Sequence, residues 1–397
     1  MNKNPNIKQI EEILKLYRST KYKKTKEITY DLLKTFPNSE ILHNIMGAIH
    51  NREDKYDESI KWHTKAIKIN PNYAEGYNNL GAALQKFGNL NEAIGNFKKA
   101  TELKPKFAKA YNNIAIIQKD LGKLDQAMDN CKIAIKLDEN FFDGHKNLGN
   151  ILSKLGKFDE ASKSYERALK IQPGDKIVLH LVSSLYGKTP KTAPDEYIAE
   201  LFDNYANRFE KHLTEVLKCK IPEEIVILIK KTSKEKLLFE STIDLGCGTG
   251  LSGILLRPLT KYLVGVDISR RMIEKAKNKK IYDHLEVENI STYIEKSQTK
   301  FDLFVFADVF VYIGDLEKIF SQISEKSNTN TKFCFSIEKC EDMDFKLLKT
   351  GRYAHSKKYI DHLSKKYNFQ VEAYNETELR LESNVPIIGY IFILKKI

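Results

Sequence analysis

A glycine-rich turn in the second half of the chain carries the clearest chemical signal. Residues 244–250 read DLGCGTG and follow an apolar run, 237–245, that is typical of a buried strand. Gly246, Gly248 and Gly250 permit a tight turn and a close approach of the backbone to a ligand. The fingerprint of dinucleotide-binding turns places its last glycine three residues after the second. Here the interval is two residues and an acid precedes the turn, so the pattern indicates a different ligand.

Polar residues also stand at the ends of the three strands that are predicted next along the chain. These residues are Asp267, Asn289 and Asp308. The carboxyl ends of parallel strands share one rim of a sheet, so the three side chains should meet Asp244 there. A carboxylate at Asp267 can accept hydrogen bonds from both hydroxyls of a ribose, and the amide of Asn289 can read the edge of adenine. Asp244 offers an acceptor to sulfonium and ammonium groups. The alternative, a purely structural strand–turn–helix, leaves the convergence of four polar groups unexplained.

The elements that position these residues can be read from the same half of the chain. Apolar runs alternate with helical stretches from residue 237 onward, in an order typical of a parallel sheet. The predicted strands are 237–245, 262–268, 285–289, 301–309, 332–338, 369–375 and 389–396. We therefore expect an open, mainly parallel, seven-stranded sheet with helices on both faces.

The first half of the chain repeats itself with a period of 34 residues. Residues 74–107, 108–141 and 142–175 align without a gap, and 40–73 and about 6–39 fit as earlier copies. Small residues recur at one position of the repeat, as Gly47, Gly81, Ala115 and Gly149. Small side chains let helices approach closely, so each repeat predicts two packed helices. Residues 176–187 predict a final helix that closes the stack.

The repeats resemble the tetratricopeptide repeat, and residues 197–397 resemble class I S-adenosylmethionine-dependent methyltransferases. The segments LFDNYANRFEKHL, DVFVYIGDL, FSIE and GRYAHS narrow this resemblance to a bacterial family of predicted methyltransferases fused to tetratricopeptide repeats. The resemblance implies an α plus α/β chain, with a helical solenoid over 1–187 and a Rossmann-like domain over 197–397. The linker between them, 188–196, contains two prolines.

The resemblance also implies a cofactor, S-adenosylmethionine, and the residues that bind it. These are Asp244, Gly246, Cys247, Gly248, Gly250, Asp267, Ile268, Asn289, Ile290 and Asp308, with Cys247 as a small neutral filler and Asp308 at the methyl-transfer end. An N-terminal helix often folds over the cofactor in such enzymes, which makes Tyr205, Phe209 and His212 candidates for a lid. Ordinary amphipathic packing is the alternative for these three residues. No metal site is expected, because the cysteines lack zinc spacing.

Five residues are candidates for the catalytic work on the methyl acceptor: Tyr312, Glu338, Arg352, Tyr353 and His355. Methyl transfer is an in-line displacement, so the enzyme mainly aligns the acceptor, and a base is needed only where the acceptor carries a proton. His355 is a candidate general base, Arg352 a candidate ligand for an acceptor carboxylate or phosphate, and Tyr312 a further candidate. The alternatives are a polar loop or helix-cap role for His355 and a surface ion pair for Arg352.

The charge of the chain and the geometry of its repeats limit which partners can be expected. Of the net charge of +12, residues 1–187 hold 31 Lys and Arg against 22 Asp and Glu, a net of +9. Because the two signs are interspersed, solvated lysines account for the excess better than an acidic partner, and nucleic acid is not expected. Stacked repeats form an open groove, for which we expect a protein or peptide partner; a scaffold role is the alternative. The residues expected near the groove are Asn78, Asn79, Asn112, Asn113, Lys146 and Asn147.

The remaining composition indicates a location and leaves three functions open. Five scattered cysteines without a CxxC motif fit a reduced compartment. The sequence has no run of 18 apolar residues and no apolar signal core, so a cytoplasmic protein without a membrane span is expected. One function is a methyltransferase to which the repeats deliver a protein or peptide. The others are a small-molecule methyltransferase whose repeats serve assembly or localisation, and a non-enzymatic adaptor. A nucleic-acid methyltransferase is a weaker fourth option, because the sequence has no NPPY-like or paired-cysteine catalytic motif.

Overall fold

The chain divides into two compact units, which are described separately. The structure is a computed structural model that describes residues 4–233, 238–382 and 384–397. Leu237, the first residue of the predicted strand 237–245, lies outside the described residues. The units are Met1–Pro173 and Gly174–Ile397. Within the described residues, no helix combines the length and apolar character that a membrane crossing needs.

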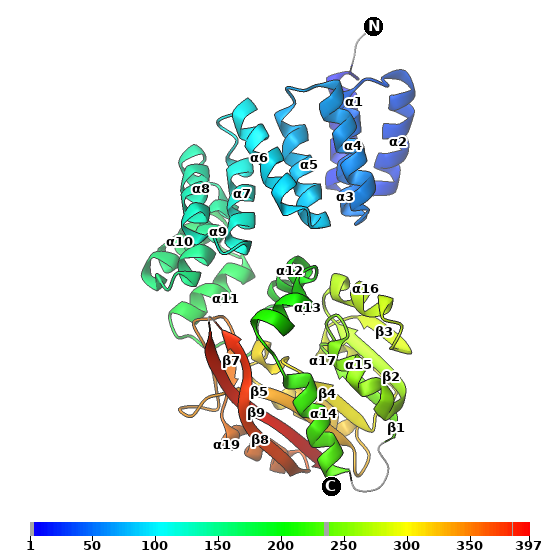
Figure 1. The fold of residues 1–397 in the computed structure, drawn as a ribbon, viewed down its shortest axis with the longest axis vertical. Coiled ribbons are helices and arrows are strands. Elements are labelled where there is room, and N and C mark those ends of the chain that lie inside the picture. The colour runs from blue at the N-terminus through cyan, green and yellow to red at the C-terminus, as the bar shows by residue number, and fades with distance from the viewer. Residues whose placement is uncertain (1–3, 234–237, 383) are drawn as a thin grey trace. The chain divides into compact units, whose positions relative to one another are not determined.

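The first unit consists of helix pairs, one pair for each predicted repeat (Figure 1). The pairs are α1 (Ile7–Arg18) with α2 (Tyr22–Thr35), α3 (Glu40–Arg52) with α4 (Tyr56–Ile69), α5 (Ala74–Phe87) with α6 (Leu90–Leu103), α7 (Ala108–Asp120) with α8 (Leu124–Leu137), and α9 (Phe142–Lys154) with α10 (Phe158–Ile171). The repeat boundaries predicted from the 34-residue period are therefore confirmed.

The small residues predicted at the helix contacts are where large side chains of the partner helix pack. A Cβ atom added at Gly47 would lie 2.6 Å from the ring of His63, and one added at Gly81 would lie 2.8 Å from Phe97. Gly149 faces Tyr165 in the same manner. These rings stand at one repeat position and are almost fully buried, so each glycine makes room for the core of its repeat.

The asparagines that we expected near the groove join neighbouring repeats instead. The Nδ2 of Asn113 donates to Oδ1 of Asn78 at 3.0 Å, and Asn147 donates to Asn112 at the same distance. Asn79 donates to Asn44 at 3.1 Å in the repeat before. Asn78, Asn112 and Asn147 are buried, so the expectation that they line an open groove is wrong. Their amides satisfy one another because buried polar groups need partners.

The second unit is built around a mixed sheet. Its strands are β1 (Phe239–Leu245), β2 (Thr260–Asp267), β3 (His284–Val287), β4 (Leu303–Phe306), β5 (Lys332–Lys339), β6 (Phe345–Leu347), β7 (Tyr353–His355), β8 (Phe369–Glu382) and β9 (Val385–Lys396). The order is β3-β2-β1-β4-β5, all parallel, followed by the antiparallel β9 and then β8. All seven predicted strands are present, and the short pair β6 and β7, which meets the end of β5 at Glu338 and Lys339, was not predicted.

Helices cover both faces of this sheet, as predicted. They are α14 (Ile221–Thr232), α15 (Leu251–Leu256), α16 (Arg270–Asn278), α17 (Ile290–Lys296), α18 (Glu317–Glu325) and α19 (Lys357–Lys366). Phe304 and Phe306 of β4 pack in one core cluster with α17, α18 and α19. Leu303 and Val305 point the other way, into a cluster with α14 and α15. The alternation of side chains along a strand thus supplies both cores.

The segment between the repeats and the sheet is folded into the second unit. Helix α11 (Lys176–Leu185), predicted to close the repeat stack, places Nε2 of His180 3.2 Å from the carbonyl of Gly351, to which it donates. The His180 ring also lies 4.8 Å from the ring of Tyr197 on α12 (Asp195–Tyr205). The compact units accordingly divide at residue 173. A repeat domain that ends at residue 187 stays a prediction from sequence register.

The predicted linker 188–196 is tied to the sheet unit by backbone hydrogen bonds. Thr192 forms a β-bridge with Ile313, and the amide of Ala193 donates to the carbonyl of Tyr312 at 3.0 Å. The carbonyl of Lys191 accepts from Gly314 at 2.9 Å. The two prolines of this segment therefore do not mark a free tether.

Two glycine substitutions test the packing of the repeats. Gly149→Ala should destabilise the first unit by about 1–2 kcal/mol, because the new methyl group meets the buried Tyr165 ring. Gly95→Ala is the matched control: no atom lies within 4 Å of its Cβ position, so helix propensity should raise stability by up to about 1 kcal/mol. Calorimetry, with fluorescence of the single tryptophan, Trp62, identifying the repeat transition, measures both. Equal effects of the two variants would contradict the packing role of Gly149.

Candidate functional site

The glycine-rich turn follows β1 and takes a backbone path that other residues rarely follow. Gly246, Gly248 and Gly250 have φ angles of +76°, +53° and +90°. In this region an L-residue is strained and glycine is not. The amide of Gly246 donates to the carbonyl of Val266 at 2.8 Å, which keeps the turn against β2. A Cβ at Gly246 would also lie 2.5 Å from Val309, so the position requires glycine for space as well as conformation.

Asp267, at the end of β2, fastens the turn from its side. One carboxylate oxygen accepts from the amide of Gly248 at 2.9 Å, and the other accepts from Ser269 at 2.8 Å. Burial raises the pKa of Asp267 to about 6, and these two amide hydrogen bonds act in the opposite direction. Each oxygen of a carboxylate can accept a second hydrogen bond. Asp267 can therefore hold the turn and bind a ligand at the same time.

Asp244 lies behind the turn rather than in front of it. The side chain is fully buried, and the hydroxyl of Tyr282 donates to its Oδ2 at 2.7 Å. Its Oδ1 has no hydrogen-bond partner among the described residues. Burial raises the pKa of Asp244 to about 7. Asp244 does not line the cavity that opens in front of the turn, so its contact with a sulfonium or ammonium group stays a prediction.

A cavity of about 840 Å³ opens in front of the turn. Of the predicted site residues, the following line it: Gly246, Cys247, Gly248, Asp267, Ile268, Asn289, Ile290, Asp308 and Tyr312. Asp244, Gly250, Arg352 and His355 are not among the lining residues. The rim predicted from the strand ends thus exists as one continuous hollow, with the acid of β1 beneath its floor.

Asn289 caps the helix that follows β3. Its Oδ1 accepts from the amide of Thr292 at 3.2 Å, and its Nδ2 donates to Asp195 at 2.9 Å. Both ends of the amide are thus engaged within the protein, although the residue lines the cavity. A role for Asn289 in reading adenine stays a prediction.

Aromatic residues of the segment before the sheet cover the turn. The Phe209 ring of α13 (Phe209–Lys211) lies 3.6 Å from the Cβ position of Gly248 and packs edge-on against Phe202. Phe202 in turn packs edge-on against Tyr312. Phe202, Phe209 and Leu213 line the cavity, so Phe209 lies where the predicted lid would cover it, and the lid role itself stays a prediction. Tyr205 and His212, also predicted, bond to each other and are not lining residues.

Polar contacts hold this lid to the sheet unit. The Oδ1 of Asp203 accepts a hydrogen bond at 2.6 Å from the hydroxyl of Ser269, which comes two residues after Asp267. Glu210 pairs with Lys279 of the same region at 2.6 Å. The lid is therefore anchored to the elements that follow β2, next to the carboxylate that fastens the glycine turn.

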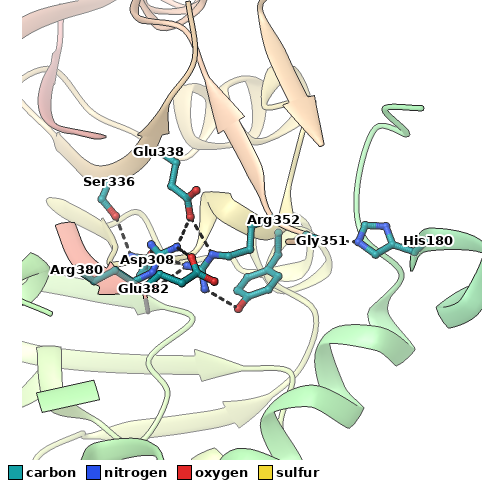
Figure 2. A network of polar contacts seen from close by, with 9 residues as sticks. His180, Asp308, Ser336, Glu338, Gly351, Arg352, Arg380 and Glu382 are labelled. Atoms are coloured by element: carbon teal, nitrogen blue, oxygen red, sulfur yellow. Dashed lines mark hydrogen bonds and ion pairs between the residues drawn. The ribbon is translucent and has the colours of Figure 1, made fainter. Parts of the chain in front are cut away.

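Asp308 forms a buried network of alternating charges with Arg352, Glu338 and Arg380, which we call the Asp308 network (Figure 2). The Nη2 of Arg352 donates to both oxygens of Asp308 at 2.9 Å, and its Nε donates to Glu338 at 2.9 Å. Arg380 also donates to both acids and is only 2% exposed. The amide of Asp308 donates to the hydroxyl of Ser336 at 2.9 Å. The carboxylate is thus fixed in place from several directions.

Arg352 and His355 do not fit the roles predicted for them. Arg352 is paired with acids of its own chain, so its guanidinium is not open to an acceptor carboxylate or phosphate. His355 is fully buried, and its Nε2 donates to the carbonyls of Ile313 and Gly314, each at 2.9 Å. Burial lowers its pKa to about 4. The general-base role is wrong for His355, because the ring is a buried cross-link that cannot reach the cavity.

Tyr312 does line the cavity, and Arg352 Nη1 donates to its hydroxyl at 3.4 Å. Burial raises the pKa of Tyr312, so the phenol is protonated at neutral pH. Ser336 and Arg380 also belong to this site and were not predicted from the sequence. Arg380 lies in a run of mixed polar residues, ETELRLE, where nothing in the pattern marks one arginine as buried.

Comparison with known proteins agrees with this architecture. Residues 240–376 match the model of a methyltransferase domain. Residues 74–107, 108–141 and 142–175 match the tetratricopeptide repeat, and residues 47–88 match a second model of that repeat. A protein of Acanthamoeba polyphaga mimivirus, named as a candidate RNA methyltransferase, is 27% identical over 218 residues. That match covers 51% of this chain and 49% of the viral protein, so the chain spans about half the length of this relative.

Other matches are partial. A MATH and LRR domain-containing protein of Plasmodium falciparum is 30% identical over 118 residues, which is 29% of this chain and 1% of that protein. Among solved structures, a tetratricopeptide-repeat protein of Thermus thermophilus aligns with 45% of this chain and 97% of its own, at 20% identity and a TM-score of 0.41. A SAM-dependent methyltransferase of Methanosarcina mazei aligns with 43% of this chain and 97% of its own, at 16% identity and a TM-score of 0.35.

Residues 240–376 are thus a class I S-adenosylmethionine-dependent methyltransferase domain. More particularly, the chain joins tetratricopeptide repeats to the N-terminal side of that domain. The residues present fit the cofactor of this class. Gly246 and Gly248 bring backbone without side chains to the cavity, and Asp267 keeps acceptor capacity at its edge.

Substitution of Asp267 tests its place in the site. Asp267→Ala removes the hydrogen bonds to the turn and the acceptors offered to a ribose, so the Kd for S-adenosylhomocysteine should rise about 10- to 100-fold. Titration calorimetry measures the Kd. Glu286→Ala, an exposed acid on β3, is the control and should leave it unchanged. An unchanged Kd for the Asp267 variant would refute the assignment.

The buried carboxyl of Asp244 predicts a pH dependence of stability. Its pKa is raised in the folded state, so the stability it contributes is lost as the pH rises from about 4 to about 7. Asp244→Asn removes this titration while keeping an acceptor for Tyr282. The free energy of unfolding of the variant, relative to the natural chain, should therefore increase by about 2 kcal/mol between pH 5 and pH 8. Calorimetric scans of the second unit at both pH values measure the difference; a constant difference contradicts the assignment.

Proposed function

We propose that the protein transfers a methyl group from S-adenosylmethionine and that its repeats recruit or orient a protein partner or substrate. One observation carries the enzymatic part of the proposal. The left-handed glycine turn, fastened by Asp267, and the fixed carboxylate of Asp308 line the same cavity. A methyltransferase domain that served only as an adaptor would need neither the glycine turn nor the fixed carboxylate of Asp308.

Different residues of the cavity would bind the cofactor, exclude water and position the acceptor. Asp267 would bind the ribose of the cofactor with its remaining lone pairs, and Gly246 and Gly248 would let the cofactor approach the backbone. Phe202 and Phe209 would exclude water from the reacting groups. Asp308 and Tyr312 would face the acceptor. The bound cofactor supplies an electrophilic methyl group, so the chain has mainly to position the two reactants.

The proposed role of the repeats rests on their architecture. Stacked tetratricopeptide repeats present an extended concave surface suited to a protein or peptide. The asparagine contacts between repeats stiffen that surface, which lowers the entropic cost of binding. All five cysteines are free, in keeping with the proposed cytoplasmic location. A small-molecule acceptor, with repeats that serve assembly, is the alternative.

RNA is a second candidate acceptor, because the mimivirus relative is named as an RNA methyltransferase and residues 1–187 carry a net charge of +9. Against it stand the carboxylates of the cavity, which would repel phosphates near the reacting end. Retention of RNA by the full chain at physiological salt would favour RNA over a protein acceptor.

Calorimetry and a truncation test the proposal. The full chain should bind S-adenosylhomocysteine; absence of binding would leave the adaptor function. Deletion of residues 1–173 should keep that affinity but reduce transfer of labelled methyl groups to the natural acceptor at least tenfold. The deletion must end at 173, because removal through 187 would also remove His180 and its bond to Gly351. Full transfer by the truncated chain would show that recruitment by the repeats is wrong.

A further inference from the structure

The acceptor end of the cavity can be located from the contacts around Asp308. Val309, the next residue, packs against Gly246 of the turn, so Asp308 stands beside the cradle proposed for the cofactor. Tyr312 and Phe202 line the same part of the cavity and touch each other. On the proposed function, an acceptor must therefore enter next to Asp308.

The charges around this cavity disfavour an anionic acceptor. Five carboxylates line it, those of Asp195, Asp267, Asp308, Asp315 and Glu317, against two lysines, Lys191 and Lys318. Lys191 is paired with Asp315 at 2.9 Å. Even with the members of the Asp308 network behind the wall included, acids exceed bases. A carboxylate, phosphate or thiolate would enter without a free cation to receive it.

The same lining lacks a group that would activate a hydroxyl. The imidazole of His355 is turned away and donates to two carbonyls. Tyr312 holds its proton because burial raises its pKa, and Asp308 is engaged by Arg352 through both oxygens. Among the described residues that line the cavity there is no histidine, and Asp308 at this end shares both oxygens with Arg352. Hydroxyl and carbon acceptors, which need such a base, are therefore disfavoured.

We infer that the methyl acceptor is an amine, whose N–H group donates to the carboxylate of Asp308. This inference rests on the proposed methyltransferase function. Arg352 approaches both oxygens of Asp308 with a single nitrogen, which leaves further lone pairs for a donor from the cavity. The Asp308 side chain is 21% exposed, so these lone pairs can be reached. The excess of carboxylates around the cavity attracts the positively charged ammonium form of an amine.

The chemistry balances without a base from the protein. The ammonium first releases one proton to water, which yields the neutral amine. The nitrogen lone pair forms the new N–C bond as the C–S bond of the sulfonium breaks and its electron pair stays on sulfur. The products are a methylated ammonium and S-adenosylhomocysteine, and the ammonium can lose its proton after release. Asp308 orients the nitrogen and is a positioning residue that touches the substrate.

The test identifies the bond that receives the label. The full chain is incubated with an extract of the cells that encode it and with S-adenosylmethionine labelled in the methyl group. Label on an amine stays bound in mild alkali and is recovered as a methylated amine after acid hydrolysis. Methyl esters release volatile methanol in alkali, and that result, or label on oxygen, sulfur or carbon, overturns the inference. Acid precipitation separates labelled protein from labelled small amines, and label on an amine in either fraction supports the inference.

Variants and a pH profile separate this inference from the proposed function. Transfer should rise about tenfold per pH unit below the pKa of the acceptor amine, because only the neutral amine reacts. Asp308→Asn should lower transfer about 10- to 100-fold and leave the Kd for S-adenosylhomocysteine within threefold, whereas Asp361→Asn on α19 should change neither. A transfer rate independent of pH overturns the amine. Absence of transfer by a chain that binds S-adenosylhomocysteine overturns the proposed function itself.

Discussion

The carboxylate of Asp267 is the interaction on which the rest of the site depends. It joins the end of β2 to the turn that leaves β1, through the amides of Gly248 and Ser269. The hydroxyl of Ser269 then holds Asp203 of the lid. One buried charge thus fixes the floor of the cavity and, through its neighbour, the cover. Its raised pKa is the cost of taking that charge out of water.

The Asp308 network also takes charges out of water, and here the charges are paired with opposite charges. Glu338 and Arg380 are buried, Asp308 and Arg352 are partly exposed, and each charge has a partner of opposite sign within hydrogen-bond distance. A positive φ of +59° at Asp308 is tolerated because Ser336 and Arg352 hold the residue in place. Rigid polar groups of this kind need not reorganise when a reactant arrives, which favours positioning over proton transfer.

The sequence predicted what local pattern encodes. The period of 34, the seven strands and the glycine turn all depend on residues close together in the chain, and the structure contains them. Asp267 and Asp308 were also found, because strand ends in a parallel sheet share a rim. The roles of Arg352 and His355 were predicted wrongly, since burial and pairing depend on residues such as Glu338 and Ile313 that are distant in sequence. No local signal distinguishes a buried arginine from an exposed one.

The entry of the chain into the second unit has a mechanical consequence. Residues 191–193 are bonded to the backbone at 312–314, which forms the wall beside Tyr312. Thr189, two residues earlier, accepts a hydrogen bond from the amide of Leu347, and His180 on α11 is bonded to Gly351. A pull on the chain from the repeats would therefore meet these contacts before it reached the wall, so the shape of the cavity is shielded from the preceding part of the chain.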